Sequence, residues 1–182
     1  MIGQDHDDGS NNFVDTSNVV AFAGMKNFLG FAKQTSGNLF IRPDIAGASW
    51  TPRGAKPGLQ GVPLPRAYYF PYCARSVGQK QWHALADTFT NNTCILNTSG
   101  SVYEFQSCDP AAPGASGELP RAHGNTFFVP GSQSNTSFKC GSTMLTIAAA
   151  QAVGYENGST CKNSTAMAPT DIQEMIRAWL RF

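Results

Sequence analysis

Asn18-Val19-Val20-Ala21-Phe22 is a stretch whose pattern, an Asn followed by apolar residues, returns three times along this chain of 182 residues. The later copies begin at Asn38, Asn92 and Asn125, so the steps between copies are 20, 54 and 33 residues. Short β-branched and aromatic runs between Asn, Ser and Gly turns are strand signals. A strand that returns after 20 residues without an intervening helix predicts stacked β-coils, and the longer steps predict insertions.

The recurring Asn has a physical role in such a stack. Asn tolerates the left-handed backbone conformation and bonds neighbouring backbone groups, so it can turn the chain into each strand. Asn side chains at equivalent places in successive coils can also bond one another as a ladder. A β-sandwich or barrel with Asn turns is the alternative fold that the pattern leaves open.

The composition limits the class of protein. The length and the 41% of hydrophobic residues suit one domain with a core, and 18 Gly and 11 Pro indicate a turn-rich chain. Only 14% of residues are charged, and the net charge is +1. No phosphate loop, zinc-protease or serine-hydrolase motif occurs, and no apolar run is long enough to span a membrane. We therefore expect neither a nucleic-acid partner nor a membrane span.

Two segments interrupt the coil pattern. Six Pro residues fall between Arg42 and Gln81, and Pro cannot continue a central strand, so we expect an excursion at about 43–80. Near the C-terminus an Ala-rich run over 144–153, closed by Gly154, predicts a helix with a left-handed cap. The chain should therefore hold coils over 1–142 and a helical cap over 143–182.

A second helix is predicted after Pro169, with Thr170 as its N-cap and Gln173 at the capping-box position. Its apolar residues form one stripe, which we expect to cover the last coil: Ile172, Met175, Ile176, Trp179 and Leu180.

Several features indicate an oxidising compartment. Five sequons in polar surroundings predict N-linked glycans at Asn91, Asn97, Asn135, Asn157 and Asn163. The chain has five Cys residues without the paired spacing of a zinc site. We expect a Cys140–Cys161 disulfide and an odd Cys that is free or bonded to another chain, whereas separate core Cys residues are the alternative.

The start at Met1 has neither a basic region nor an apolar leader. The sequons and the Cys residues nevertheless lead us to expect a secreted, extracellular glycoprotein whose signal peptide is not in this chain.

The chain resembles a known superfamily in several segments. Residues 7–12, the strand after Asn18, residues 24–31 and residues 37–40 look like successive coils of the pectate-lyase-like superfamily. The ending over 151–160, followed by a short final helix, is also similar to theirs. The resemblance implies an all-β, right-handed parallel β-helix (solenoid) with short C-terminal capping helices. It also implies an extracellular, carbohydrate-directed protein, since members include polysaccharide lyases, glycoside hydrolases and epimerases.

The densest chemical cluster is Asp5-His6-Asp7-Asp8, which Gly9 ends. Two carboxylates on one face can bind Ca²⁺ or raise one another's pKa for acid chemistry, whereas a solvated turn is the alternative. Lys26 should lie one coil further on and stack above this turn, where a cation stabilises developing charge. We therefore take Asp5, Asp7, Asp8 and Lys26 as candidate catalytic residues.

Candidate sugar-binding residues come from cationic and aromatic positions. Arg42 could supply charge, and Tyr68 and Tyr69 are surrounded by Pro residues. Trp82 offers a stacking face beside His83, although such residues are more often core.

Two functions follow from these observations. The first is an extracellular β-helix glycoprotein that binds or processes a polysaccharide, with lyase, epimerase or hydrolase-like chemistry if it is active. The second is a non-enzymatic structural or matrix glycoprotein that assembles through its solenoid, by self-assembly or through the odd Cys.

Overall fold

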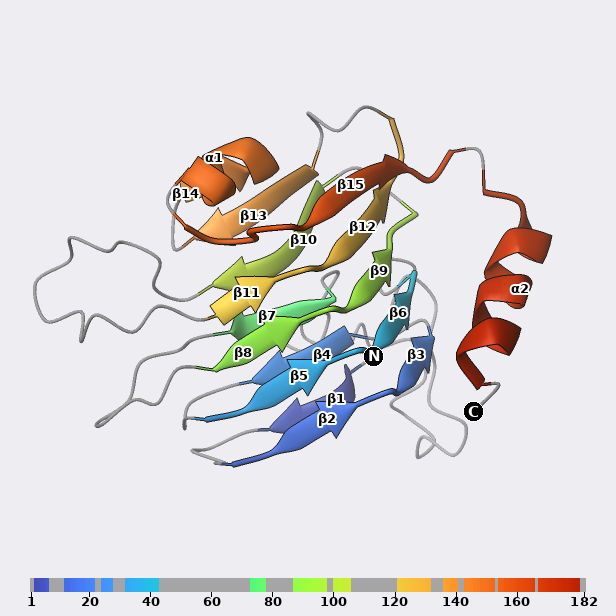
Figure 1. The fold of residues 1–182 in the computed structure, drawn as a ribbon, viewed down its shortest axis with the longest axis horizontal. Coiled ribbons are helices and arrows are strands. Elements are labelled where there is room, and N and C mark those ends of the chain that lie inside the picture. The colour runs from blue at the N-terminus through green and yellow to red at the C-terminus, as the bar shows by residue number, and fades with distance from the viewer. Residues whose placement is uncertain are drawn as a thin grey trace, which may run out of the picture.

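The first thirteen strands that the structure describes enter three sheets in turn (Figure 1). The computed structural model describes residues 2–6, 12–21, 24–27, 32–42, 73–77, 87–97, 100–105, 121–131, 136–140, 143–152, 154–165 and 167–180. The expected excursion at about 43–80 lies almost wholly outside these ranges.

Sheet A has six strands, and its order is β1 (Ile2–His6), β4 (Gly24–Asn27), β7 (Ala74–Val77), β10 (Gly100–Phe105), β13 (Thr136–Cys140) and β14 (Thr143–Thr146). Sheet B has the order β11 (Arg121–His123), β8 (Thr88–Thr90), β5 (Gln34–Ser36) and β2 (Val14–Thr16). Sheet C has the order β15 (Thr160–Asn163), β12 (Thr126–Val129), β9 (Thr93–Ile95), β6 (Leu39–Ile41) and β3 (Val19–Ala21).

Sheets B and C are wholly parallel, and sheet A is parallel except for the β13–β14 pair. We call each set of one strand per sheet a layer, so that β1, β2 and β3 form the first layer. The all-β expectation is confirmed for the described part of the chain.

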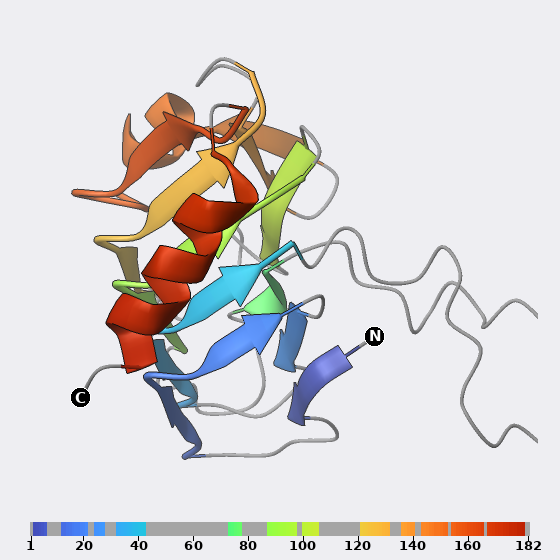
Figure 2. The same cartoon turned by 90° about the vertical axis from the view of Figure 1, so that its right-hand side faces the viewer.

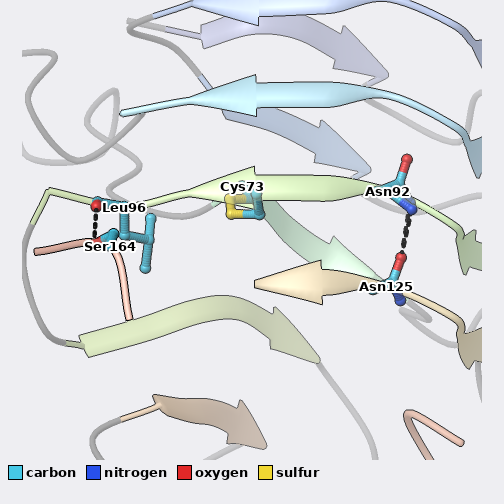
Figure 3. Close-up of a disulfide and its surroundings, with 6 residues drawn as sticks. Cys73, Asn92, Leu96, Asn125 and Ser164 are labelled. Carbon is cyan, nitrogen blue, oxygen red and sulfur yellow. Dashed lines mark hydrogen bonds between the residues drawn. A yellow bond between two sulfur atoms is a disulfide. The ribbon is translucent and has the colours of Figure 1, made fainter. Parts of the chain in front are cut away.

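The recurring Asn residues lie at the same place in successive layers. Sheet C aligns Val19 with Leu39, Leu39 with Thr93, and Thr93 with Thr126, so the residue before each is an equivalent Asn. The amide Oδ1 of Asn38, Asn92 and Asn125 accepts the backbone N–H of the preceding Asn, at 2.9, 3.0 and 2.8 Å. The predicted ladder is confirmed, and Figure 3 shows the rung between Asn92 and Asn125.

The left-handed conformation belongs to the residue before each Asn, which corrects the expected role of the Asn itself. Ser17, Gly37, Asn91 and Gly124 have φ values of 57°, 60°, 54° and 66°. The Asn instead bonds across layers: the Nδ2 of Asn92 donates to the carbonyl of Thr35 at 3.0 Å. Tight turning and layer-to-layer bonding are thus divided between two neighbouring residues.

The core is a column of side chains between the three sheets. Buried residues from all three sheets and from the C-terminal segment form one cluster, including Met25, Phe40, Phe89, Phe127 and Phe138. The ring centroids of Phe127 and Phe138 lie 5.4 Å apart in an edge-to-face contact.

A disulfide joins Cys73, just before β7, to Cys94 in β9. It therefore links sheet A to sheet C within the third layer, and both residues are fully buried. The expected Cys140–Cys161 pair stays a prediction, because the structure does not describe the Cys140 side chain; Cys161 is buried in the core.

The helices differ from their expected places. Residues 143–146 form β14, which pairs with β13, so the first helix is α1 (Ile147–Ala152) rather than 144–153. Gly154 has a φ of 89°, as a left-handed cap requires. The segment expected as a helical cap also supplies β15 to sheet C.

Helix α2 (Pro169–Leu180) begins with Pro at its first position, and Asp171 Oδ2 accepts the N–H of Ala168 at 2.7 Å. Thr170 is therefore not the N-cap. The stripe does not cover the last layer: Ile172 packs with Leu39, Ile41 and Ile95 of sheet C. The helix lies over this sheet in Figure 2, and β6, whose three residues are all buried, is thus covered on both faces.

Candidate functional site

The predicted acid and its predicted cation are neighbours in sheet A. The register aligns Asp5 of β1 with Lys26 of β4. Neighbouring parallel strands lie about 4.8 Å apart, and residues in register share one face of the sheet. The expected stacking of Lys26 on the acidic segment is confirmed at the level of the backbone.

The same position carries a charge in each later layer of sheet A. Lys26 aligns with Arg75, and Glu104 aligns with Lys139. Glu104 also lies between the pairs Tyr103–Ala74 and Phe105–Val77, where the register shifts, and so it faces the Arg75–Ser76 step. We call Asp5, Lys26, Arg75, Glu104 and Lys139 the charged row.

Sequence reasoning found only the first two members of the charged row. Arg75, Glu104 and Lys139 come from strands whose Asn-led pattern is absent, so their alignment depends on insertions of unequal length. Each of Lys26, Arg75 and Lys139 follows a small or apolar residue in a short strand, but this signal is common in solvated strands.

The other candidate residues divide into described and undescribed ones. Asp7, Asp8, Tyr68, Tyr69, Trp82 and His83 lie outside the described residues, as does the sequon residue Asn135. Of the remaining sequon residues, Asn91, Asn97, Asn157 and Asn163 are all exposed. Arg42 follows β6, at the end of sheet C, away from the sheet A strands that hold Asp5 and Lys26.

A buried acid ends the Asn ladder. Glu156 is fully buried, and its Oε2 accepts from Asn125 Nδ2 at 3.0 Å and from the Ser159 hydroxyl. Ser159 takes the next rung, since its Oγ accepts the N–H of Asn125 at 2.8 Å. Burial raises the pKa of Glu156 from 4.5 to about 8, against the opposing effect of the Ser159 hydrogen bond. Glu156 is therefore neutral at pH 7.

Metal binding stays a prediction. Within the described ranges, no group of three or more His, Cys, Asp or Glu residues is placed to hold an ion. The Ca²⁺ hypothesis depends on Asp7 and Asp8, which are not described.

Comparisons with known proteins add no relative. No family model, no curated protein and no solved structure matches the chain. Among the described residues, no helix is both long and apolar enough to cross a bilayer. The class defined by fold and site is thus a mostly β protein with parallel sheets, an internal disulfide and one charged row.

Proposed function

We propose that the layers are coils of a right-handed parallel β-helix in an extracellular glycoprotein, and that this protein binds an acidic polysaccharide along the charged row. Sheet orders that advance by one strand per layer support the β-helix. Parallel strands joined by crossovers are right-handed in about 98% of cases, which supports the handedness. The buried disulfide fits an oxidising compartment, and the exposed sequon residues are accessible for glycosylation.

The single observation that supports binding of an acidic polysaccharide is the register of the charged row. One charge per strand gives a spacing of about 4.8 Å, close to the length of one sugar in an extended chain. Lys26, Arg75 and Lys139 can each pair with a carboxylate of a uronate polymer. Asp5 and Glu104 alternate with these cations in the register, and proton abstraction next to a uronate carboxylate needs an acid or base together with a cation.

Affinity electrophoresis through polygalacturonate gels tests the binding. The wild type should be retarded relative to a neutral glucan gel, and Lys26→Gln/Arg75→Gln should lose most of the retardation. Lys162→Gln/Arg177→Gln is the matched control, because it removes two cations from sheet C and α2. Retardation should also fall at high salt, since the charges are screened. Equal retardation in both gels, or in both double variants, would refute the proposal.

A separate assay tests whether the protein cleaves the polysaccharide. Release of unsaturated or reducing ends from polygalacturonate should fall strongly in Asp5→Asn if Asp5 takes part in chemistry. Retained gel retardation with no release by the wild type identifies a binding protein rather than an enzyme.

A second function, assembly between copies, is favoured by the different ends of the stack. In the first layer Phe13 is 43% exposed and Val19 is half-buried, whereas the aligned Lys33 and Leu39 of the second layer are fully buried. At the opposite end α1 contacts β13 and β14 (Figure 1). Two copies that pair through these exposed first-layer side chains would form a closed two-fold dimer.

Light scattering after gel filtration tests this second function. The wild type should show a concentration-dependent dimer, and Val14→Lys on the edge strand β2 should abolish it. Met144→Lys is the control, because Met144 is similarly exposed at the opposite end, with 52% against 62% for Val14. A monomer at all concentrations would exclude self-assembly.

A further inference from the structure

A cavity of about 220 Å³ lies where the strands of sheet C end, beside the start of α2. Its lining combines one cation with polar and apolar residues: Arg42, Ile95, Leu96, Asn97, Pro130, Ser164, Thr165, Met167 and Ile172. These residues follow or belong to β6, β9, β12, β15 and α2, so only the folded stack of layers forms the cavity.

Arg42 is held in place by its backbone. Its N–H donates to the carbonyl of Ile95 at 2.7 Å, and its φ is 47°, which is a strained value for a residue with a side chain. Within the described part of the chain, its guanidinium has no hydrogen bond or ion pair, and no Asp or Glu lines the cavity. Among the described residues that line the cavity, Arg42 thus carries the charge, and it is positive.

Two hydroxyl groups that line the cavity can still form hydrogen bonds with a ligand. The Ser164 hydroxyl donates to the carbonyl of Leu96 at 3.3 Å, as Figure 3 shows, which leaves its lone pairs to accept. The Thr165 hydroxyl accepts the N–H of Gly131 at 3.2 Å, which leaves its hydrogen to donate. A ligand with hydroxyl groups can satisfy both.

Three buried apolar residues also border the cavity. Ile95, Leu96 and Ile172 line the cavity and are 1%, 2% and 7% exposed. Little of these three side chains is accessible, so a ligand would be held mainly by the polar groups of the cavity.

We propose that this cavity binds a single hexuronate ring, whose carboxylate pairs with Arg42 and whose hydroxyls bond Ser164 and Thr165. The ring is a free sugar acid or the end of an acidic chain, because both carry the same groups. The ligand class rests on the proposed polysaccharide function, but the cavity and the charged row involve different residues.

Saturation-transfer NMR and calorimetry with galacturonate, galactose and trigalacturonate test the proposal. Galacturonate should bind, and galactose should bind at least roughly tenfold more weakly because it lacks the charge-assisted pair. Arg42→Gly should weaken galacturonate binding roughly tenfold or more. Gly is also the residue that accepts a positive φ most readily, so this variant keeps the backbone geometry. Arg177→Gln, which removes a cation from α2, should bind as the wild type does.

The outcomes separate the cavity from the charged row. Lys26→Gln/Arg75→Gln should keep galacturonate binding, and Arg42→Gly should keep retardation in polygalacturonate gels. Saturation transfer to the terminal ring of trigalacturonate shows that a chain end enters the cavity. Binding of the monosaccharide alone identifies a free sugar acid as the ligand. Equal affinity for galactose and galacturonate, or unchanged affinity in a folded Arg42→Gly, overturns the proposal.

Discussion

Glu156 is an acid whose side chain is fully buried at the end of the Asn ladder. An acid with a raised folded pKa holds its proton more tightly in the folded state than in the unfolded chain. Its contribution to stability is therefore complete below pH 4.5 and is lost as the pH rises towards about 8. The steepest loss is about 1.4 kcal/mol per pH unit.

Glu156→Gln should remove this pH dependence. Urea unfolding between pH 5.5 and 8 should show a falling free energy for the wild type and a flatter, higher curve for the variant at pH 8. Glu174→Gln, an exposed acid of α2, should keep the wild-type slope. Parallel slopes in all three proteins would contradict the assignment.

Gly124 and Gly37 occupy equivalent turns, with φ values of 66° and 60°, but their surroundings differ. A Cβ at Gly124 would collide with the Asn91 amide, whereas a Cβ at Gly37 meets nothing within 4 Å. Each Gly→Ala change should cost about 1 kcal/mol for the left-handed backbone.

Gly124→Ala should therefore unfold at clearly lower urea concentration than Gly37→Ala. Adding Asn91→Gly to Gly124→Ala should recover most of the difference, because it removes the colliding amide. No recovery would mean that the cost at Gly124 comes from the backbone alone.

At the scale of the element, the amphipathic pattern of α2 predicts an apolar face but does not predict which surface that face packs against. Four of the five predicted stripe residues, from Ile172 to Trp179, pack against sheet C, whereas Leu180 is 65% exposed. The stripe could have packed against any exposed apolar face of the stack. The short connection between β15 and α2 limits the choice to faces near the end of β15. The helix packs against sheet C because Leu39, Ile41 and Ile95 form an apolar outer face there.

Ile172→Ala should cost about 2–4 kcal/mol in the free energy of unfolding, because Ile172 is 7% exposed in this contact. Leu180→Ala should cost little, since Leu180 is 65% exposed. Thermal unfolding by circular dichroism checks the pair. Equal effects would show that α2 does not depend on the Ile172 contact.

At the scale of the whole molecule, the Cys73–Cys94 disulfide closes a loop of 21 residues between two sheets. Cross-linking a loop of this size stabilises by about 3 kcal/mol through the unfolded chain. Cys73→Ala/Cys94→Ala should lose about this amount in urea unfolding, and reducing agent should destabilise the wild type more than the double variant. A Cys161→Ala variant that retains the sensitivity to reductant confirms that the Cys73–Cys94 bond is responsible.

The candidate site was predictable to different degrees at its different positions. Asp5 and Lys26 could be paired because only a short uninterrupted step separates their strands. Arg75, Glu104 and Lys139 could not be added, since the insertions between layers conceal the register. Arg42 was named for its charge, but the cavity beside it depends on β15 and α2, which lie more than 100 residues further along the chain.

The sequence by itself determined the repeating strand, the ladder of Asn18, Asn38, Asn92 and Asn125, and the amphipathic character of α2, because these depend on local backbone preference and on periodicity. Only the tertiary structure decided the partner of Cys73, the face that α2 covers and the alignment of the charged row. Those features depend on which distant segments lie side by side, and segments of unequal length between the layers remove the spacing from which that could be read.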